Sequence, residues 1–420
     1  MKRKWFKVKW IGLYLVFFLT MCGFANPITP RLSSEQRDQL ILESKLKEYQ
    51  SVKILTLIGD PYALGYQHGY FMRNDIHEQW EHIMKYARSQ LPIPIINRIY
   101  IELKLDWTYW KMRRFISADY KEEMRGLAEG AGIPLRFVHQ AHAIPDLFPM
   151  LCANGVYYGR AVADGKLYHL RNLDWSREMG IHNYPVVFVV KPTGKNSFVN
   201  LGYAGFVGVL SGINENGLSV GQVGSDTIDF TLKGEPMPFI LRRVLEESQS
   251  LEDAATIVKN AKRTYGYNYV FGDALNKRAV ALETTATQFS VFLTNDPKEK
   301  ASGYGLILED VLIRSDMAFD TRIRSLQTAS GGNPKTPELE PPTGKAYETR
   351  YKKQTELAQT NYSKINPTIL MEIAREIAPG SNIQSVIFGY PDVWVANAVG
   401  TARAADSKYV HLNVKDLLKD

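Results

Sequence analysis

The sequence predicts an α+β protein in which antiparallel sheets are packed together and covered by helices. Three observations support this class. A mainly helical first part gives way at Cys152 to short β-rich runs separated by turn signals. Asp164-Gly165 and Asn216-Gly217 lie between alternating apolar segments, which is a strong hairpin signal. Helix pairs flank the strand-rich stretches, and this segregation of strands from helices is typical of α+β folds.

The first part contains few strand signals. Residues 26–50 are polar and are predicted to be loosely helical, and residues 52–58 are predicted to form a strand that ends at Gly59-Asp60-Pro61. Residues 64–109 follow helical patterns with a break at Pro92 and Pro94. Residues 118–133 are predicted to form an amphipathic helix that closes at Gly132.

The second part is predicted to consist of strands and two helical regions. The helical regions are residues 238–262, divided by an N-cap at Ser250, and residues 348–377. Residues 331–345 are rich in Pro, Gly and Thr and are predicted to be a loop. The predicted strands are residues 155–162, 166–173, 185–191, 198–203, 207–213, 218–223, 268–271, 279–283, 289–293, 383–388 and 393–397.

Composition and charge exclude several classes of protein. The chain has 420 residues, of which 45% are hydrophobic and 23% charged, so it is neither disordered nor a polytopic membrane protein. The net charge is +7, but five basic residues lie before residue 26, where no acidic residue occurs, and the rest carries only +2. A nearly neutral body argues against a nucleic-acid partner.

The amino terminus is predicted to be a secretory signal peptide, residues 1–25. A basic stretch precedes the apolar run from Trp10 to Met21, and small residues follow at Gly23 and Ala25. This order of charge, apolar run and small residues predicts cleavage after Ala25. An uncleaved anchor and a lipoprotein attached through Cys22 are the alternatives. The mature protein is therefore expected to be secreted or periplasmic, and a peripheral membrane contact remains open.

Export would leave Cys152 as a lone thiol, because Cys22 would leave with the signal peptide. Such a thiol is expected to be either deeply buried or used in chemistry. The predicted hairpin after Cys152 returns Arg171 and Asp174 toward it. A guanidinium lowers the pKa of a thiol, and a carboxylate orients an ammonium group or accepts its proton. The alternatives are a buried apolar cysteine and an ion pair at the end of a hairpin.

Other chemical motifs are weak or missing. The sequence has no Gly-rich phosphate loop, no G-x-S-x-G elbow and no H-E-x-x-H pair. His139 and His142 are three residues apart, so a metal-dependent hydrolase is a remote alternative to ordinary packing. No metal or other cofactor is expected.

The region around Cys152 resembles a known family. Cys152, residues 159–167 and Arg171-Asn172-Leu173-Asp174-Trp175 are similar to the opening of the mature catalytic chain of N-terminal nucleophile hydrolases. Within these, the chain most resembles the acyl-coenzyme A:6-aminopenicillanate acyltransferase group, whose relatives include choloylglycine hydrolase and acid ceramidase. Further motifs follow the group's order: residues 59–69, 126–132, 212–218, Tyr267-Asn268 with Asp273, Thr349-Arg350-Tyr351, residues 382–386 and residues 393–397.

This resemblance implies a four-layer αββα sandwich and a self-processing enzyme. Residues 26–151 would be a mainly helical prosegment, and residues 152–420 the catalytic domain, freed by an N-to-S acyl shift before Cys152. The new α-amino group would serve as the base for its own thiol, since such groups titrate near pH 8. The thiolate would attack the amide of a small N-acyl substrate, and water or another acceptor would resolve the thioester. Hydrolysis is favoured, because acyl-coenzyme A is not expected outside the cytoplasm.

The resemblance also assigns residues by position. Arg171 would support the thiolate, Asp174 would hold the α-amino group, and Arg350 would pack against the aspartate and the nucleophile. Asn214 belongs to a hairpin on the pocket side, with a role there that is open between structure and binding. The candidates for an acyl pocket, any of which could instead be plain core, are Trp80, Trp107, Trp110, Phe148 and Tyr157.

The chain departs from the family pattern at three places. Ala153 follows the cysteine where Ser or Thr is common, and Leu151 precedes it where a small residue is common. The asparagine that donates to the oxyanion is best matched by Asn295, whereas Asp316 fits the spacing to Arg350 better and would place an anion there. A secreted binding protein that keeps the fold without turnover is therefore the alternative function. The sequence does not predict the acyl chain or the oligomeric state.

Overall fold

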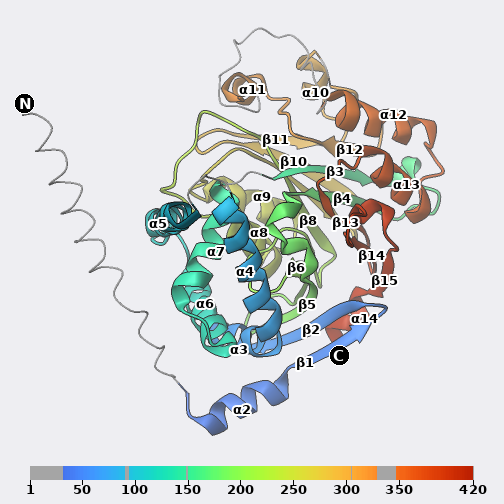
Figure 1. Cartoon of the computed structure of the whole chain (residues 1–420). Coiled ribbons are helices and arrows are strands. Elements are labelled where there is room, and N and C mark those ends of the chain that lie inside the picture. Colours follow the sequence, from blue (N-terminus) through green and yellow to red (C-terminus); the bar gives the residue numbers. More distant parts are fainter. Residues whose placement is uncertain (1–31, 90–93, 148–149, 304, 329–346, 420) are drawn as a thin grey trace, which may run out of the picture.

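The protein is described from a computed structural model, which covers residues 32–89, 94–147, 150–303, 305–328 and 347–419. The expected signal peptide, Phe148 and the predicted loop at 331–345 lie outside these residues. Two sheets form the centre of the molecule (Figure 1). The larger has the strand order β1-β2-β5-β6-β7-β8-β9-β10-β11, and the smaller has the order β12-β3-β4-β13-β14-β15.

Most strands of the second part lie near their predicted bounds, but β3 begins four residues before the predicted 155–162, and β12 and β15 were not predicted. The strands are β1 (Lys45–Tyr49), β2 (Val52–Gly59), β3 (Leu151–Tyr157), β4 (Tyr168–Asp174), β5 (Pro185–Pro192), β6 (Phe198–Tyr203), β7 (Gly212–Asn214), β8 (Leu218–Gly224), β9 (Tyr267–Asp273), β10 (Arg278–Thr284), β11 (Phe289–Leu293), β12 (Val311–Arg314), β13 (Asn382–Gly389), β14 (Asp392–Asn397) and β15 (Val410–Asn413).

Helices occur in both parts of the chain, and several of them pack on the sheets. They are α2 (Ser34–Glu43), α3 (Pro61–Phe71), α4 (Arg73–Ser89), α5 (Pro94–Met112), α6 (Ala118–Ala131), α7 (Leu135–Leu147), α8 (Met237–Glu247), α9 (Leu251–Asn260), α10 (Lys298–Ala301), α11 (Thr321–Leu326), α12 (Lys353–Thr360), α13 (Pro367–Ile377) and α14 (Val414–Lys419). Helices α3, α8 and α9 contact the nine-stranded sheet, and α13 contacts β4 and β13 of the six-stranded sheet.

The two sheets pack face to face, so the predicted four-layer αββα arrangement is confirmed. Strand β5 illustrates this, because successive side chains of a strand point to opposite faces. Val186 and Phe188 belong to the core shared with the helices. Val187 and Val189 belong to a second core shared with β13, β14 and β15. A hydrogen bond of 2.9 Å between His169 Nδ1 on β4 and Ser219 Oγ on β8 also joins the sheets.

Glycine motifs in the first part have a packing explanation. Helices α3 and α6 lie so close that a Cβ atom at Gly65 would come within 1.9 Å of the Glu123 carbonyl oxygen. A Cβ atom at Gly126 would come within 2.2 Å of the Tyr62 carbonyl oxygen. Side chains at these positions would separate the helices, which explains why the motifs at 59–69 and 126–132 are rich in glycine.

The first part is less purely helical than predicted. Residues 45–49, predicted to be helical, form the edge strand β1, in which only Lys47 is partly buried. Strand β2 pairs in parallel with β5, from Lys53 opposite Val186 to Gly59 opposite Pro192. The first part therefore supplies two strands to the larger sheet, and one pairing in that sheet is parallel rather than antiparallel.

Three further predictions need correction. The connection from β3 to β4 is not a two-residue turn, because it spans residues 158–167 and contains a short 3-10 helix at Gly159–Ala161. The strand predicted at 207–213 is reduced to β7. The predicted helix at 348–377 is divided into a π-helical turn at Tyr347–Lys352 and two α-helices, the second of which begins with Pro367. The N-cap at Ser250 is confirmed, with Asp253 completing a capping box.

Candidate active site

Cys152 lies at the start of β3, where the ends of several segments meet. In the antiparallel pairing with β4, Leu151 lies opposite Asp174 and Cys152 lies opposite Leu173. On the other side of β4, Asn382 at the start of β13 also lies opposite Asp174. Antiparallel neighbours place the start of one strand beside the end of the next, so the sequence-distant groups converge here.

Arg350 connects the predicted site residues. Its Nη2 donates to Asp174 Oδ2 at 2.6 Å, and its Nη1 donates to the carbonyl oxygen of Cys152 at 2.8 Å. Arg350 is on the π-helical turn, a distortion that is frequent at functional sites. The structure therefore brings Cys152, Asp174 and Arg350 together, as predicted.

The sulfur of Cys152 is fully buried beside Arg171 and the main chain of Asp174. Burial raises the pKa of the Cys152 thiol, while the neighbouring Arg171 guanidinium opposes this shift. Arg171 donates through Nη1 to the Asn172 carbonyl at 2.6 Å, and its Nε and Nη2 have no partner among the described oxygen and nitrogen atoms. In the uncleaved chain the thiol is thus near its predicted cation but is not poised as a thiolate.

Asp174 is buried and held by two partners. Besides Arg350, it accepts a hydrogen bond of 2.9 Å from Asn382 Nδ2. A register shift in β13 between Asn382 and Gln384 sets this geometry, and such bulges re-aim side chains next to active sites. Burial raises the pKa of the Asp174 carboxyl, although Arg350 and Asn382 oppose the shift. Asn382 was part of a family motif, but no role was predicted for it.

Asn295 does not lie at this site, contrary to the prediction. It is exposed after β11, and its Oδ1 accepts a hydrogen bond from the Asp310 amide at 3.3 Å. Asp316 occupies the place instead, because β12 pairs with β3 and carries the chain past Cys152. Asp316 Oδ1 accepts a hydrogen bond of 3.3 Å from the Cys152 amide, and its Oδ2 is 3.7 Å from Arg350 Nη1.

Tyr157 and Asn214, which were candidates for the substrate pocket, also lie away from Cys152. Tyr157 is five residues from Cys152 on β3, so its side chain points to the opposite face, where its hydroxyl accepts a hydrogen bond from Gln354 on α12. Asn214 donates to the carbonyls of Leu245 and Ser248 at the end of α8 and accepts from the Leu218 amide. Asn214 is therefore a structural link between a hairpin and a helix.

His139 and His142 pack in the helical layer. His139 stacks on Tyr109 with the ring centroids 3.9 Å apart. Both ring nitrogens of His142 are in hydrogen bonds to the main chain, with the Val138 carbonyl and the Val207 amide. The described residues contain no group of three His, Cys, Asp or Glu side chains arranged to hold a metal.

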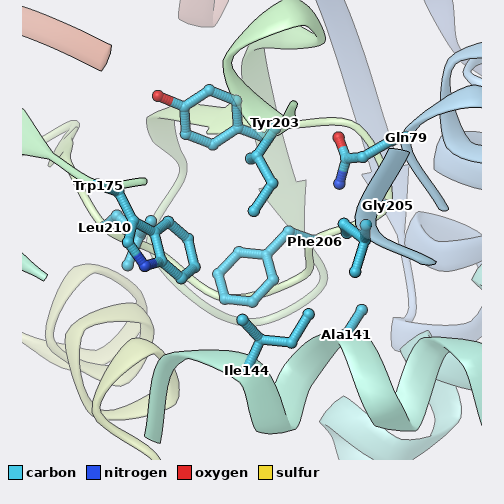
Figure 2. A pocket seen from close by; sticks show the side chains of 10 residues that line it. Gln79, Ala141, Ile144, Trp175, Tyr203, Gly205, Phe206 and Leu210 are labelled. Carbon is cyan, nitrogen blue, oxygen red and sulfur yellow. The ribbon is translucent and has the colours of Figure 1, made fainter. Parts of the chain in front are cut away.

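A small cavity adjoins the site (Figure 2). Trp175, Tyr203, Phe206 and Ile144 are among its lining residues, and Arg171 and Cys152 both act electrostatically on Tyr203. Its volume of about 20 Å³ leaves room for about one water molecule, so an acyl chain would enter only if side chains moved. None of the predicted tryptophans lines it: Trp80 stacks on Phe137, and Trp107 and Trp110 are about half exposed.

The two-sheet sandwich and the site geometry match the class predicted from the motifs, the N-terminal nucleophile hydrolases. Residues 162–296 match the model of the family "Acyl-coenzyme A:6-aminopenicillanic acid acyl-transferase". The predicted resemblance to this group is thus confirmed for a segment that contains Arg171 and Asp174.

Curated relatives are similar to this chain over part of its length. The chain is 27% identical over 264 residues to the protein dcd1B of Dictyostelium discoideum, covering 59% of this chain and 53% of that protein. It is 30% identical over 181 residues to the acid ceramidase of Rattus norvegicus, covering 37% and 45%. The chain thus spans about half the length of the curated relatives it matches.

Among solved structures, the Caenorhabditis elegans ortholog of N-acylethanolamine-hydrolyzing acid amidase aligns with a TM-score of 0.41 at 15% identity, covering 56% of this chain and 92% of that one. Penicillin V acylase from Agrobacterium tumefaciens aligns with a TM-score of 0.41 at 13% identity, covering 64% and 88%.

Proposed function

We propose that this protein is a self-processing cysteine amidohydrolase, with acyl transfer as a related activity, that cleaves linear amide bonds of small N-acyl substrates. The observation that carries the proposal is the Arg350 bridge. One guanidinium binds both the carbonyl of Cys152 and the carboxylate of Asp174, while the sulfur lies beside Arg171. The names of the relatives, acid ceramidase and acid amidase, point to the same substrate class.

Processing would convert the buried thiol into a nucleophile. Cleavage between Leu151 and Cys152 turns the Cys152 amide nitrogen into an α-amino group, which accepts the thiol proton at neutral pH. The sulfur then attacks the substrate carbonyl, the amine leaves with a proton, and water hydrolyses the thioester. Arg171 stabilises the negative sulfur, and Arg350 and Asn382 keep Asp174 in place.

The test compares Cys152→Ala with Cys152→Ser in the full chain. We expect Cys152→Ala to remain a single uncleaved polypeptide without activity, and Cys152→Ser to be processed slowly. Intact-mass spectrometry detects the cleavage. Activity is measured as the release of aminomethylcoumarin from N-acyl derivatives of several chain lengths. A Cys152→Ala protein with full activity would contradict the proposal.

The alternative is a binding protein that keeps the fold without turnover, and the burial of the Cys152 sulfur favours it. Alkylation separates the two. In a processed enzyme, iodoacetamide should modify Cys152 rapidly at pH 7, because the α-amino group then serves as a base for the thiol. In a binding protein, the thiol should react only after unfolding in urea.

We further propose export and a peripheral membrane contact. Among the described residues, no helix combines the length and the apolar character needed to cross a bilayer. Helix α5 exposes Trp107 and Trp110 by about half of their surface, and Lys111 lies over both rings at 5.3 and 5.2 Å. Aromatic rings beside basic groups are typical of helices that lie in a membrane interface. Sedimentation with anionic vesicles should fall in the Trp107→Ala/Trp110→Ala variant.

A further inference from the structure

Asp316 is directed at the nitrogen of the peptide bond that processing would cut. Its Oδ1 is 3.3 Å from the Cys152 amide nitrogen, the donor in their hydrogen bond. Its Oδ2 is 3.7 Å from Arg350 Nη1. The side chain is only 12% exposed, so this contact is made away from bulk water.

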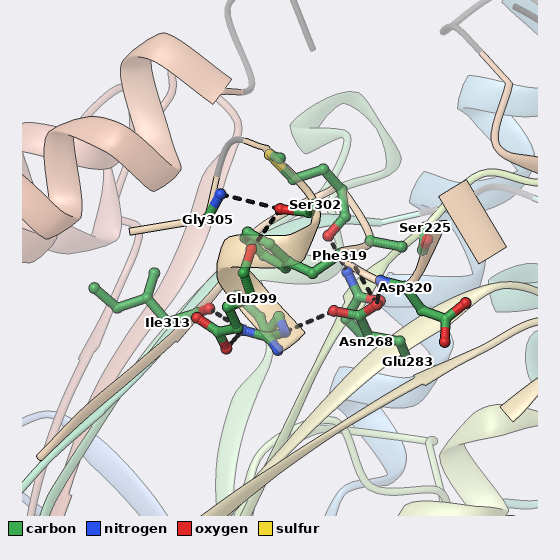
Figure 3. A network of polar contacts seen from close by, with 12 residues as sticks. Ser225, Asn268, Glu283, Glu299, Ser302, Gly305, Ile313, Phe319 and Asp320 are labelled. Atoms are coloured by element: carbon green, nitrogen blue, oxygen red, sulfur yellow. Dashed lines mark hydrogen bonds and ion pairs between the residues drawn. The ribbon is translucent and has the colours of Figure 1, made fainter. Parts of the chain in front are cut away.

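The segment that carries Asp316 is fixed by three buried side chains, two of which, Asn268 and Glu283, are labelled in Figure 3. Asn268 Nδ2 donates to the main-chain carbonyls on both sides of Asp316, at 2.9 and 2.8 Å. Gln327 donates to the carbonyl of Asp316 itself at 3.2 Å and accepts from the amide two residues later at 3.0 Å. Glu283 accepts from the two amides that follow, at 2.7 and 2.8 Å.

Glu283 is in turn held by a buried ion cluster. Arg314 lies 3.0 Å from Glu283 and 2.7 Å from Glu299, and its guanidinium lies over the Phe319 ring at 4.5 Å. Arg314 and Glu283 have no exposed side-chain surface. Burying charges is costly unless the geometry is good, so this cluster is weak evidence for stability. It does, however, restrain the segment that positions Asp316.

We propose that Asp316 is the acid that protonates the departing nitrogen of Cys152 during self-processing, and that its carboxylate then binds the freed α-amino group. This inference rests on the proposed function, because it concerns the same scissile bond. It gives the aspartate a role that the expected asparagine cannot fill, since an amide does not act as a proton donor of this kind at physiological pH.

Self-processing begins with attack of the Cys152 thiol on the carbonyl carbon of Leu151. The bond from Cys152 Sγ to the Leu151 carbonyl carbon forms, and the carbon–nitrogen bond breaks. The thiol proton passes to the Asp174 carboxylate, and the Asp316 carboxylic acid gives its proton to the nitrogen. Water then adds to the thioester carbon, sulfur leaves with one proton from water, and the products are a Leu151 carboxyl group and a free Cys152 thiol and amine.

The buried surroundings of Asp316 favour the protonated form of its carboxyl group. Arg350 from the π-helical turn favours the carboxylate, as does the Cys152 amide. Burial has the larger and opposite effect, and the negative charges of Asp174 and Asp226 add to it. Together these raise the pKa of Asp316 to about 6. Processing should therefore be faster at pH 5, where most molecules carry the proton, than at pH 7.5.

The test uses the full chain, made by cell-free translation and diluted into buffers from pH 5 to pH 8. Cleavage before Cys152 is followed by gel electrophoresis, and the new amino terminus is verified by mass spectrometry. We expect the wild-type rate to fall as the pH rises above about 6. In Asp316→Asn the rate at pH 5 should be about 100-fold lower, a typical contribution of general acid catalysis, and its pH dependence should flatten.

Two variants control for structural damage. Asp320→Asn removes a charge from the same segment but keeps the oxygen that caps α11, so it should process like the wild type. Asp316→Glu retains an acid and should recover part of the rate and its pH dependence. An Asp316→Asn chain that processes with the wild-type rate and pH profile would overturn the inference. A wild-type chain that is never cleaved before Cys152 would instead contradict the proposed function.

Discussion

Two buried arginines, Arg242 and Arg350, have similar surroundings but different consequences. Arg242 lies between Glu123 at 2.7 Å and Glu246 at 2.8 Å, and it also donates to a main-chain carbonyl. Arg350 is close to Asp174 at 2.6 Å and Asp316 at 3.7 Å, and it also donates to a main-chain carbonyl. Each cluster is one guanidinium between two carboxylates.

The difference lies in what the clusters face. The carbonyl at Arg242 belongs to Val207, and the cluster joins α6 of the first part of the chain to α8 of the second. The carbonyl at Arg350 belongs to Cys152, and one of its carboxylates binds the Cys152 amide. A buried ion cluster therefore indicates a reactive site only when it is directed at a reactive atom. The Arg242 cluster has the geometry of a structural link.

The largest effect on chemistry is expected from Arg350→Met. Asp174 would lose its closest cation, and the main chain at Cys152 would lose its anchor. We expect processing to slow, and in the molecules that are processed we expect kcat to fall by about 100-fold with little change in KM, as for a positioning residue. Steady-state kinetics with an N-acyl aminomethylcoumarin substrate measures kcat and KM separately. A variant with normal kcat would show that the Arg350 cluster, like that of Arg242, is structural.

The largest effect on stability is expected from Arg242→Met, which leaves Glu123 buried without its cation, whereas Glu246 keeps Lys195 at 2.9 Å. Removing one partner of a buried pair costs about 3–5 kcal/mol. The free energy of unfolding from urea titration should fall by this amount, while kcat per folded molecule stays unchanged. Adding Glu123→Gln should recover part of the loss. If the single variant lost kcat without losing stability, the distinction between the two clusters would be wrong.

The residues of the Arg350 cluster can be predicted from the sequence more readily than the ion pair between Arg242 and Glu123. Cys152, Asp174 and Arg350 stand in motifs whose order along the chain is informative, and the hairpins between them carry local turn signals. Nothing local marks Arg242 as the partner of Glu123, which is more than a hundred residues away and on a different helix. Pairing of this kind depends on how layers stack, which periodicity does not encode.

The predictions that the structure contradicts have different physical causes. Asn295 was preferred over Asp316 from a two-residue pattern, but the choice depends on the pairing of β12 with β3 across a long sequence separation. Strand β1 was missed because a short, exposed edge strand lacks apolar alternation. The placement of Tyr157 in the pocket contradicts strand geometry, because two residues of one strand that are five positions apart point to opposite faces. The side-chain hydrogen bonds of Asn214 could be known only from the packed helix α8.

The smallest effect is expected in the pH dependence of stability, and it tests the Arg350 cluster without turnover. In a Cys152→Ala background the chain stays uncleaved, so Asp316→Asn can be compared with its parent. The pKa of Asp316 is raised to about 6, which means that folding favours the protonated form.

An aspartate in an unfolded chain has a pKa of about 3.9. The contribution of Asp316 to stability is therefore fully present below this pH, and it is lost as the pH rises through about 6. The difference in thermal midpoint between parent and variant should follow this course between pH 4 and pH 8. A parent that instead gained stability over the variant as the pH rose would mean that Arg350 holds Asp316 as a carboxylate.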